Sequence, residues 1–139
     1  MKRILIPLLA AAAFLALPVS AQDDPRIAFG LEAAETWLEL TDLHYYDASW
    51  DQSAASFQAA VPRARWLTGI AKLREPLGKM ISRTPSSARF AESVAGAPNG
   101  EYVTIEYDSE FENKKDAVET VTTRHEKDGT WKVMGYQLS

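Results

Sequence analysis

Apolar residues in the first part of the chain recur every three or four positions, the spacing of a helix that buries one face. The segment starts at Asp24-Pro25. Aspartate can accept a hydrogen bond from a free amide of the first turn, and proline suits the first helical position, so this pair predicts a helix start. The face expected to contact a core consists of Ile27, Leu31, Ala34, Leu38, Thr41 and Tyr45.

Two short helices and one longer helix are expected next. Asp47 and Ser53 each precede a short segment with one large apolar residue, Trp50 and Phe57 respectively, and both polar residue types are favoured as helix caps. Pro62 starts the longer segment, since proline is favoured at the beginning of a helix. The apolar face of this longer helix consists of Trp66, Ile70, Leu73 and Leu77.

The period changes to two after residue 79, which predicts β-strands. In the clearest case Val103, Ile105 and Tyr107 alternate with polar residues, so one side of the strand faces a core and the other faces water. Pro85 indicates a bend or an edge position, because proline cannot donate to a neighbouring strand. The expected extended segments are 80–94, 101–112, 117–126 and 130–138.

The Asp128-Gly129 pair is the strongest hairpin signal in the chain, and it sets an expected register for the last two strands. If Lys127 pairs with Thr130, a definite set of partners follows. The pairs are Glu119 with Leu138, Val121 with Tyr136, and Thr123 with Met134. The face predicted to meet the helices then carries Glu119, Val121, Met134, Tyr136 and Leu138, and the opposite face carries Thr120, Thr122, Arg124, Trp131 and Val133.

The start of the chain predicts an export signal. A short basic region precedes an apolar run over 4–17, and small residues up to Ala21 fit a signal-peptidase site. We therefore expect residues 1–21 to be a cleaved Sec-type signal peptide, residues 22–139 to form one α+β domain, and the protein to be periplasmic or secreted. The apolar run is shorter than the ~20 residues of a spanning helix, so no integral membrane segment is expected after cleavage.

Composition and charge limit the classes of ligand and partner that the protein is expected to bind. Cleavage removes two of the 15 basic residues and none of the 19 acidic residues, which leaves 118 residues with a formal charge of −6. We expect no nucleic-acid partner, because nucleic acid binding needs clustered positive charge. Two histidines and no cysteine argue against a metal site, and no motif calls for a cofactor. Basic residues gather in 63–89. Such an asymmetry can steer a protein partner, but we favour the alternative that these residues form an ordinary solvated surface.

Helical segments followed by a curved antiparallel sheet of about four strands are the element order of the nuclear-transport-factor-2-like (cystatin-like) cone. Short motifs narrow this resemblance: Glu32-Ala33-Ala34 with Trp37-Leu38, Tyr46-Asp47-Ala48-Ser49-Trp50, Arg74-Glu75-Pro76-Leu77-Gly78, Gly96-Ala97-Pro98-Asn99-Gly100 and Trp131-Lys132-Val133-Met134-Gly135-Tyr136. In order and spacing they resemble the bacterial exported family called domain of unknown function 4019. The resemblance covers nearly all of residues 22–139. It implies an exported domain with the cone fold and no established activity, so it carries over no catalytic residue.

Glu119 is the side chain most open to a chemical interpretation, because the expected register points it inward. Burial raises a carboxyl pKa toward the range useful in acid–base catalysis. Alternatively, an arginine partner holds the carboxylate ionised and inert, and Arg83 on an earlier extended segment is the expected partner. Tyr107 and Tyr136 can present hydroxyls to the same cavity, or pack in the core with their hydroxyls satisfied. The candidate cavity residues are therefore Glu119, Tyr107, Tyr136 and Arg83, and no residue is assigned as catalytic.

Two classes of function stay open. In the first, the domain is a non-catalytic binding or assembly module for an unknown protein, a small apolar ligand, or a second copy of itself as a homodimer. In the second, it is a small cofactor-free enzyme that uses Glu119 with Tyr107 or Tyr136. No motif requires the second class, so we favour the first. The discriminating observation is whether Glu119 is paired with Arg83 or stands alone in an open apolar hollow.

Overall fold

The computed structural model describes residues 24–139, so the predicted signal peptide over 1–21 lies outside the described residues. Within them, helical elements precede four β-strands, as the sequence predicts. The helices are α2 (Pro25–Asp42), α3 (Tyr46–Asp51), α4 (Ala55–Ala60), α5 (Arg63–Arg74) and the short 3-10 helix η1 (Glu75–Leu77). The strands are β1 (Met80–Ala91), β2 (Tyr102–Phe111), β3 (Lys114–His125) and β4 (Trp131–Leu138). No helix in this part of the chain is long and apolar enough to cross a membrane.

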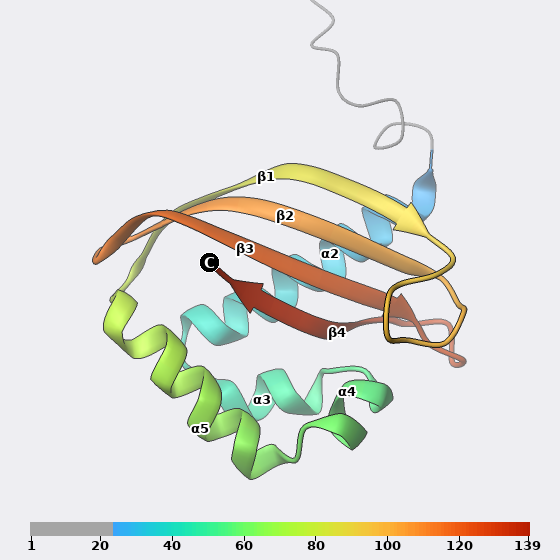
Figure 1. Cartoon of the computed structure of the whole chain (residues 1–139), viewed down its shortest axis with the longest axis horizontal. Helices are drawn as coiled ribbons and strands as arrows, with labels where there is room; N and C mark the ends of the chain where they lie inside the picture. The colour runs from blue at the N-terminus through green and yellow to red at the C-terminus, as the bar shows by residue number, and fades with distance from the viewer. Residues whose placement is uncertain (1–23) are drawn as a thin grey trace, which may run out of the picture.

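The four strands form one antiparallel sheet in sequence order, β1-β2-β3-β4. The sheet is curved; α2 crosses one of its faces, and α3, α4 and α5 lie beyond the β4 edge (Figure 1). The α+β class, with N-terminal helices packed on a four-stranded antiparallel sheet, is therefore confirmed. The core between helices and sheet includes Ile27, Ala34, Trp37 and Leu38 from α2 and Val103, Ile105, Val121 and Val133 from the sheet.

Helix α2 begins as predicted and packs closely on β2. The Asp24 carboxylate accepts a hydrogen bond from a first-turn amide at 3.0 Å. Gly30 allows the close approach, because a Cβ at this position would lie 2.5 Å from Cβ of Val103. Tyr45 was expected to extend the apolar face, but it is exposed. The helix ends before Tyr45, and the chain turns at His44, whose φ of 63° is left-handed.

The predicted caps of the two short helices are wrong. Asp47 already lies in the first turn of α3, and the residue that precedes α4 is Ala54 rather than Ser53. Ser53 instead donates to the carbonyl of Ser49 at 2.7 Å and accepts from the indole N–H of Trp37 at 3.1 Å. The Ser53 hydroxyl accepts a hydrogen bond from a buried tryptophan instead of capping a helix. This pairing is favourable because a buried donor without an acceptor is costly.

Helix α5 starts after Pro62 as predicted, but its buried face is rotated. Ile70 is buried, whereas Leu73 is 38% exposed and Arg74 is only 2% exposed. The reason is polar: Arg74 points into the molecule and donates to the hydroxyl of Thr41 on α2 at 3.0 Å. A hydrophobic pattern cannot indicate such an inward-facing arginine.

Strand β1 forms a free edge of the sheet, which confirms the edge position predicted from Pro85. A register shift between Pro85 and Ser87 interrupts the pairing with β2. An irregular edge that contains proline is a poor template for pairing with another strand. Strand β3 is longer than predicted and begins at Lys114 instead of residue 117, because the preceding turn is tight.

The predicted register of β3 and β4 is confirmed for the pairs far from the hairpin turn and is wrong for the pairs near it. The confirmed pairs are Glu119 with Leu138 and Val121 with Tyr136. Thr123 pairs with Val133 rather than with Met134, because a register shift follows Thr122. Such a β-bulge adds one residue to one strand and reverses the faces of the residues beyond it.

The bulge corrects the predicted faces of β4. Val133 is buried and Trp131 packs against the core, although both were expected on the face away from the helices. Met134 was expected to face the helices, but it borders a hollow on the opposite face. The Ala54 amide donates to the Val133 carbonyl at 2.7 Å, so the loop before α4 holds β4 in this arrangement.

Candidate functional site

Glu119 is completely buried and paired with Arg83. Nε of Arg83 donates to Oε1 of Glu119 at 2.7 Å, and a terminal nitrogen of the same guanidinium donates to Oε2 at 3.2 Å. The Glu119 side chain is 0% exposed. The expected partner is therefore the observed one. Two parallel hydrogen bonds are the arrangement in which arginine holds a carboxylate most firmly.

Two hydroxyls complete the hydrogen bonding of Glu119. The Ser109 hydroxyl donates to Oε1 at 2.6 Å, and the Tyr136 hydroxyl donates to Oε2 at 2.5 Å. Each carboxylate oxygen therefore accepts two hydrogen bonds. Burial, and after it the negative charge of Glu119, raises the pKa of Tyr136 above its usual value. The phenol consequently keeps the proton that it donates.

Asp42 and Arg74 extend this cluster to the helices. Oδ2 of Asp42 accepts from Arg83 at 2.7 Å, and Oδ1 accepts from Arg83 at 2.9 Å and from Arg74 at 2.7 Å. The Arg74 guanidinium also lies over the ring of Phe111, 4.8 Å from its centre. Two arginines thus face two carboxylates. We call Asp42, Arg74, Arg83 and Glu119 the buried ion network.

The buried ion network fixes the charges of its members. Burial alone would raise the pKa of Asp42, but the hydrogen bonds and charges of Arg83 and Arg74 outweigh burial and hold that pKa below its usual value. Burial likewise lowers the pKa of Arg83, and Asp42 and Glu119 raise it by more. Arg83 and Asp42 are therefore charged at neutral pH, and their attraction connects α2 to the sheet.

Tyr107, a candidate for the same cavity, lies opposite Glu119 in the sheet but makes no side-chain hydrogen bond to the network. The residue is 1% exposed, and its hydroxyl has no hydrogen-bond partner within residues 24–139. Burial, followed by the nearby charge of Glu35, raises the pKa of Tyr107. Tyr107 borders a cleft of about 240 Å³ that is also lined by Glu35, Glu39, Asp42 and Arg83. The structure thus brings Arg83, Glu119 and Tyr136 into one hydrogen-bonded group and leaves Tyr107 outside it.

The geometry around Glu119 is that of a structural carboxylate. A general base needs a free lone pair within reach of its substrate. Both oxygens of Glu119 are occupied by protein donors, and none of the side chain is exposed. The described residues, 24–139, also contain no group of three His, Cys, Asp or Glu side chains that could hold a metal ion. The arrangement can join strands and helices, and it offers no open acid or base at Glu119.

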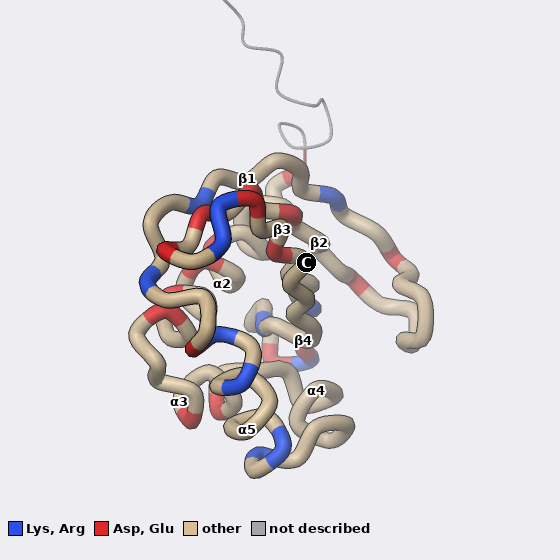
Figure 2. Tube along the Cα trace, turned by 60° about the vertical axis from the view of Figure 1, so that its left-hand side comes forward, with Lys and Arg blue, Asp and Glu red and all other residues tan. Residues whose placement is uncertain are grey.

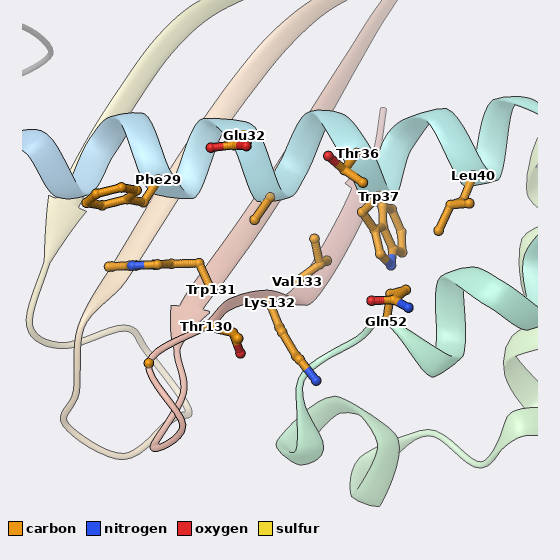
Figure 3. A pocket seen from close by; sticks show the side chains of 12 residues that line it. Phe29, Glu32, Thr36, Trp37, Leu40, Gln52, Thr130, Trp131, Lys132 and Val133 are labelled. Atoms are coloured by element: carbon orange, nitrogen blue, oxygen red, sulfur yellow. The ribbon is translucent and has the colours of Figure 1, made fainter.

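An open groove lies between α2 and the hairpin end of β4 (Figure 3). Its volume of about 420 Å³ is within the range of small-ligand sites. Phe29 on α2 and Trp131 on β4 lie across from each other at one end, and Trp37 and Leu40 line the other end. Phe29 is 55% exposed. We call this feature the aromatic groove.

Sequence reasoning identified Arg83 as the partner of Glu119, but it did not identify Ser109 as a second donor or Phe29 as a groove residue. A signal exists for Ser109, because it occupies an inward position of β2 between Tyr107 and Phe111, where an apolar residue is expected. A signal also exists for Phe29, a large apolar residue that lies off the apolar face of its helix. Exposed aromatic residues of this kind often mark binding surfaces when they belong to a patch.

Some of the basic residues over 63–89 form ion pairs with acidic residues of the helices. Basic positions of α5 lie beside acidic positions of α3 (Figure 2). Arg63 donates to Asp47 at 2.9 Å and also forms an ion pair with Asp51. Arg74 and Arg83 are both used by the buried ion network. Three of the seven basic residues over 63–89 therefore pair with nearby acidic residues.

Fold and site together define an α+β domain with a buried ion network between its layers and an open aromatic groove at one side. A comparison with protein families places the chain more narrowly. It belongs to the family described as "Protein of unknown function (DUF4019)", whose model matches residues 33–136. The family resemblance inferred from the short motifs is thus confirmed. No curated protein matches the chain.

Proposed function

We propose that the protein is an exported, non-catalytic binding module with a nuclear-transport-factor-2-like cone, and that it acts in the periplasm. The basic, apolar and small-residue pattern over 1–21 supports export. The order of helices followed by a curved antiparallel sheet supports the cone (Figure 1). The aromatic groove between helix and sheet supports a binding role.

The pairing of Glu119 with Arg83 is the observation that carries the non-catalytic part of the proposal. An isolated carboxylate in an open hollow would have favoured a cofactor-free enzyme. Glu119 instead has four hydrogen bonds from Arg83, Ser109 and Tyr136 and no exposed surface. A residue bound in this way stabilises the fold and is closed to substrate.

The ligand that we assign to the aromatic groove is small, flat and apolar. The rings of Phe29 and Trp131 border the same end of the groove, so a flat ligand can contact both (Figure 3). Aromatic contacts of this kind contribute about 0.5–1.5 kcal/mol each beyond the area that they bury. Trp131 also stacks on His125, with ring centres 4.9 Å apart. This stacking holds the indole in place before a ligand arrives, which lowers the entropic cost of binding.

A titration of the intact protein with the neutral fluorophore N-phenyl-1-naphthylamine tests the groove. We expect saturable binding, and Phe29→Ala and Trp131→Ala should each weaken it at least about tenfold. Tyr45→Ala is the matched control, because Tyr45 is 58% exposed and lies outside the groove residues. Binding that stays equal in all three variants would overturn the assignment of this groove.

A further inference from the structure

A second hollow lies on the face of the sheet that points away from α2. Its volume is about 450 Å³, and it is enclosed by β3, β4, α4 and the loop between β1 and β2. Figure 1 shows that loop descending toward α4 beside the ends of β3 and β4. The Tyr102 hydroxyl donates to the carbonyl of Pro98 and so fastens the loop to the sheet. We call this feature the outer hollow.

Arg124 gives the outer hollow its charge. It is the only charged side chain among the described residues that line the hollow. Four other arginines, Arg26, Arg63, Arg74 and Arg83, each form an ion pair with a carboxylate. Arg124 forms no such pair within residues 24–139, and its Nε is buried without a hydrogen-bond partner. The guanidinium lies 5.9 Å from the centre of the Tyr102 ring, which borders the same hollow. In a domain with an acidic balance, this cavity therefore holds an arginine without an ion-pair partner among residues 24–139.

Residues with hydroxyl groups line the same hollow. Thr120, Thr122 and Arg124 alternate along β3, so all three side chains are on the same face of the sheet. Ser56 on α4 also borders the hollow, and its hydroxyl oxygen is buried without a partner in the described part of the chain. Buried donors without acceptors are uncommon and costly in proteins. The hollow is therefore bordered by polar side chains as well as by the arginine.

The rest of the wall is apolar and leaves room for a ligand. Phe57, Pro98 and Met134 line the hollow together with the polar groups. Gly135 lies opposite Thr122 in the sheet and contributes no side chain. A Cβ at Gly135 would have only an ordinary contact, 3.9 Å from Cβ of Thr122. The space beside the threonines is therefore open because this position is glycine.

We propose that the outer hollow binds the carboxylate of a small acid that has an apolar body. The guanidinium of Arg124 offers paired donors that match a carboxylate, and the threonines of β3 line the same hollow. The apolar body lies against the apolar part of the wall. This site is independent of the aromatic groove, which lies on the other face of the sheet and is lined by different residues.

Titrations of the intact protein with octanoate, 1-octanol and acetate separate the contributions of charge and apolar body. Chemical shifts of the Thr122 and Gly135 amides report on the hollow. We expect octanoate to bind saturably and at least about tenfold more tightly than either 1-octanol or acetate. Octanoate that produces no saturable shifts, or 1-octanol that binds as tightly, would overturn the proposal.

Two variants test the site itself. Arg124→Met should weaken octanoate binding at least about tenfold, and Arg89→Met, at an exposed arginine of β1, should leave it unchanged. Gly135→Val should weaken octanoate binding, because the valine side chain fills the space beside Thr122 while Arg124 keeps its charge. Gly135 is not among the glycines with positive φ, so its backbone conformation accepts valine. Thermal unfolding of each variant confirms that it is folded. Octanoate binding that is the same in Arg124→Met as in the unaltered protein would contradict the site.

Discussion

Nε of Arg83 on β1 lies 2.7 Å from Oε1 of Glu119 on β3, and the pair spans the intervening strand β2. Ser109 of β2 donates to the same carboxylate oxygen, so three adjacent strands meet at one acceptor. The terminal nitrogens of Arg83 also bind Asp42 at the end of α2. A single arginine thus connects the sheet to the helical layer, which explains why a fully buried glutamate is tolerated in the core.

Replacing Glu119 should cost much of the stability of the domain. Glu119→Gln leaves two arginines facing one carboxylate, and an uncompensated buried charge of this kind costs about 3–5 kcal/mol in the free energy of unfolding. Urea unfolding followed by circular dichroism measures the change. Glu110→Gln on β2 is the control, because Glu110 is outside the network, and it should change stability by less than about 0.5 kcal/mol. An unchanged unfolding curve for Glu119→Gln would show that the pair is not structural.

The two buried tyrosines should respond differently to loss of the hydroxyl. Tyr136→Phe removes a hydrogen bond to the charged Glu119 and should cost about 1.5–3 kcal/mol. Tyr107→Phe removes a buried hydroxyl that has no partner within residues 24–139, so it should be neutral or stabilising. Thermal or urea unfolding of the two variants at neutral pH makes the comparison. Equal losses of stability would contradict the assigned hydrogen bonds.

Asp42 should make stability depend on pH in the acid range. Its pKa in the folded protein is below the value of about 3.9 expected for the unfolded chain. Ionised Asp42 therefore stabilises the fold above about pH 4, and this stabilisation disappears as pH falls through the lower folded pKa. Asp42→Asn should cost about 1–3 kcal/mol at pH 7, and the difference from the unaltered protein should shrink below about pH 4. The measurement is urea unfolding across this pH range, with Asp108→Asn on the exposed face of β2 as the control. A difference that stays constant with pH would exclude this role for Asp42.

Two glycine-to-alanine changes in helices should have opposite signs. Gly30→Ala places a methyl group 2.5 Å from Cβ of Val103, so α2 must move away from β2 and stability should fall by about 1–3 kcal/mol. Gly69→Ala in α5 meets nothing within 4 Å and should stabilise the protein by about 0.5–1 kcal/mol through helix propensity. Melting temperatures of the two variants test the prediction. A stabilising Gly30→Ala would contradict the close packing of α2 on the sheet.

Much of the fold could be predicted from the sequence because its signals are local. The cap at Asp24, the period-two alternation around Ile105 and the Asp128-Gly129 turn each report on a few neighbouring residues. The inward position of Glu119 followed from counting residues back from the hairpin, and it suggested an arginine partner. These predictions depend on side-chain periodicity and on the residue preferences of turns, both of which are set by residues close together in the chain.

The remaining features depend on contacts between distant residues. The bulge after Thr122 adds one residue to β4, which turns Trp131 toward α2 and helps to form the aromatic groove. No residue type in the hairpin marks that bulge. Arg74 is buried because its guanidinium donates a hydrogen bond to the carboxylate of Asp42, which is far away in the chain. A pattern of apolar positions contains no information about such a polar pairing.

Native mass spectrometry of the protein recovered from the periplasmic fraction tests the proposed function most directly. We predict a mature chain that begins at Gln22 and carries a small apolar molecule, and we predict that Trp131→Ala loses this molecule while Tyr45→Ala retains it. A chain that still carries residues 1–21 and stays in the cytoplasm would contradict export. A mature chain without any bound molecule, or one whose molecule is retained by Trp131→Ala, would contradict binding in the aromatic groove.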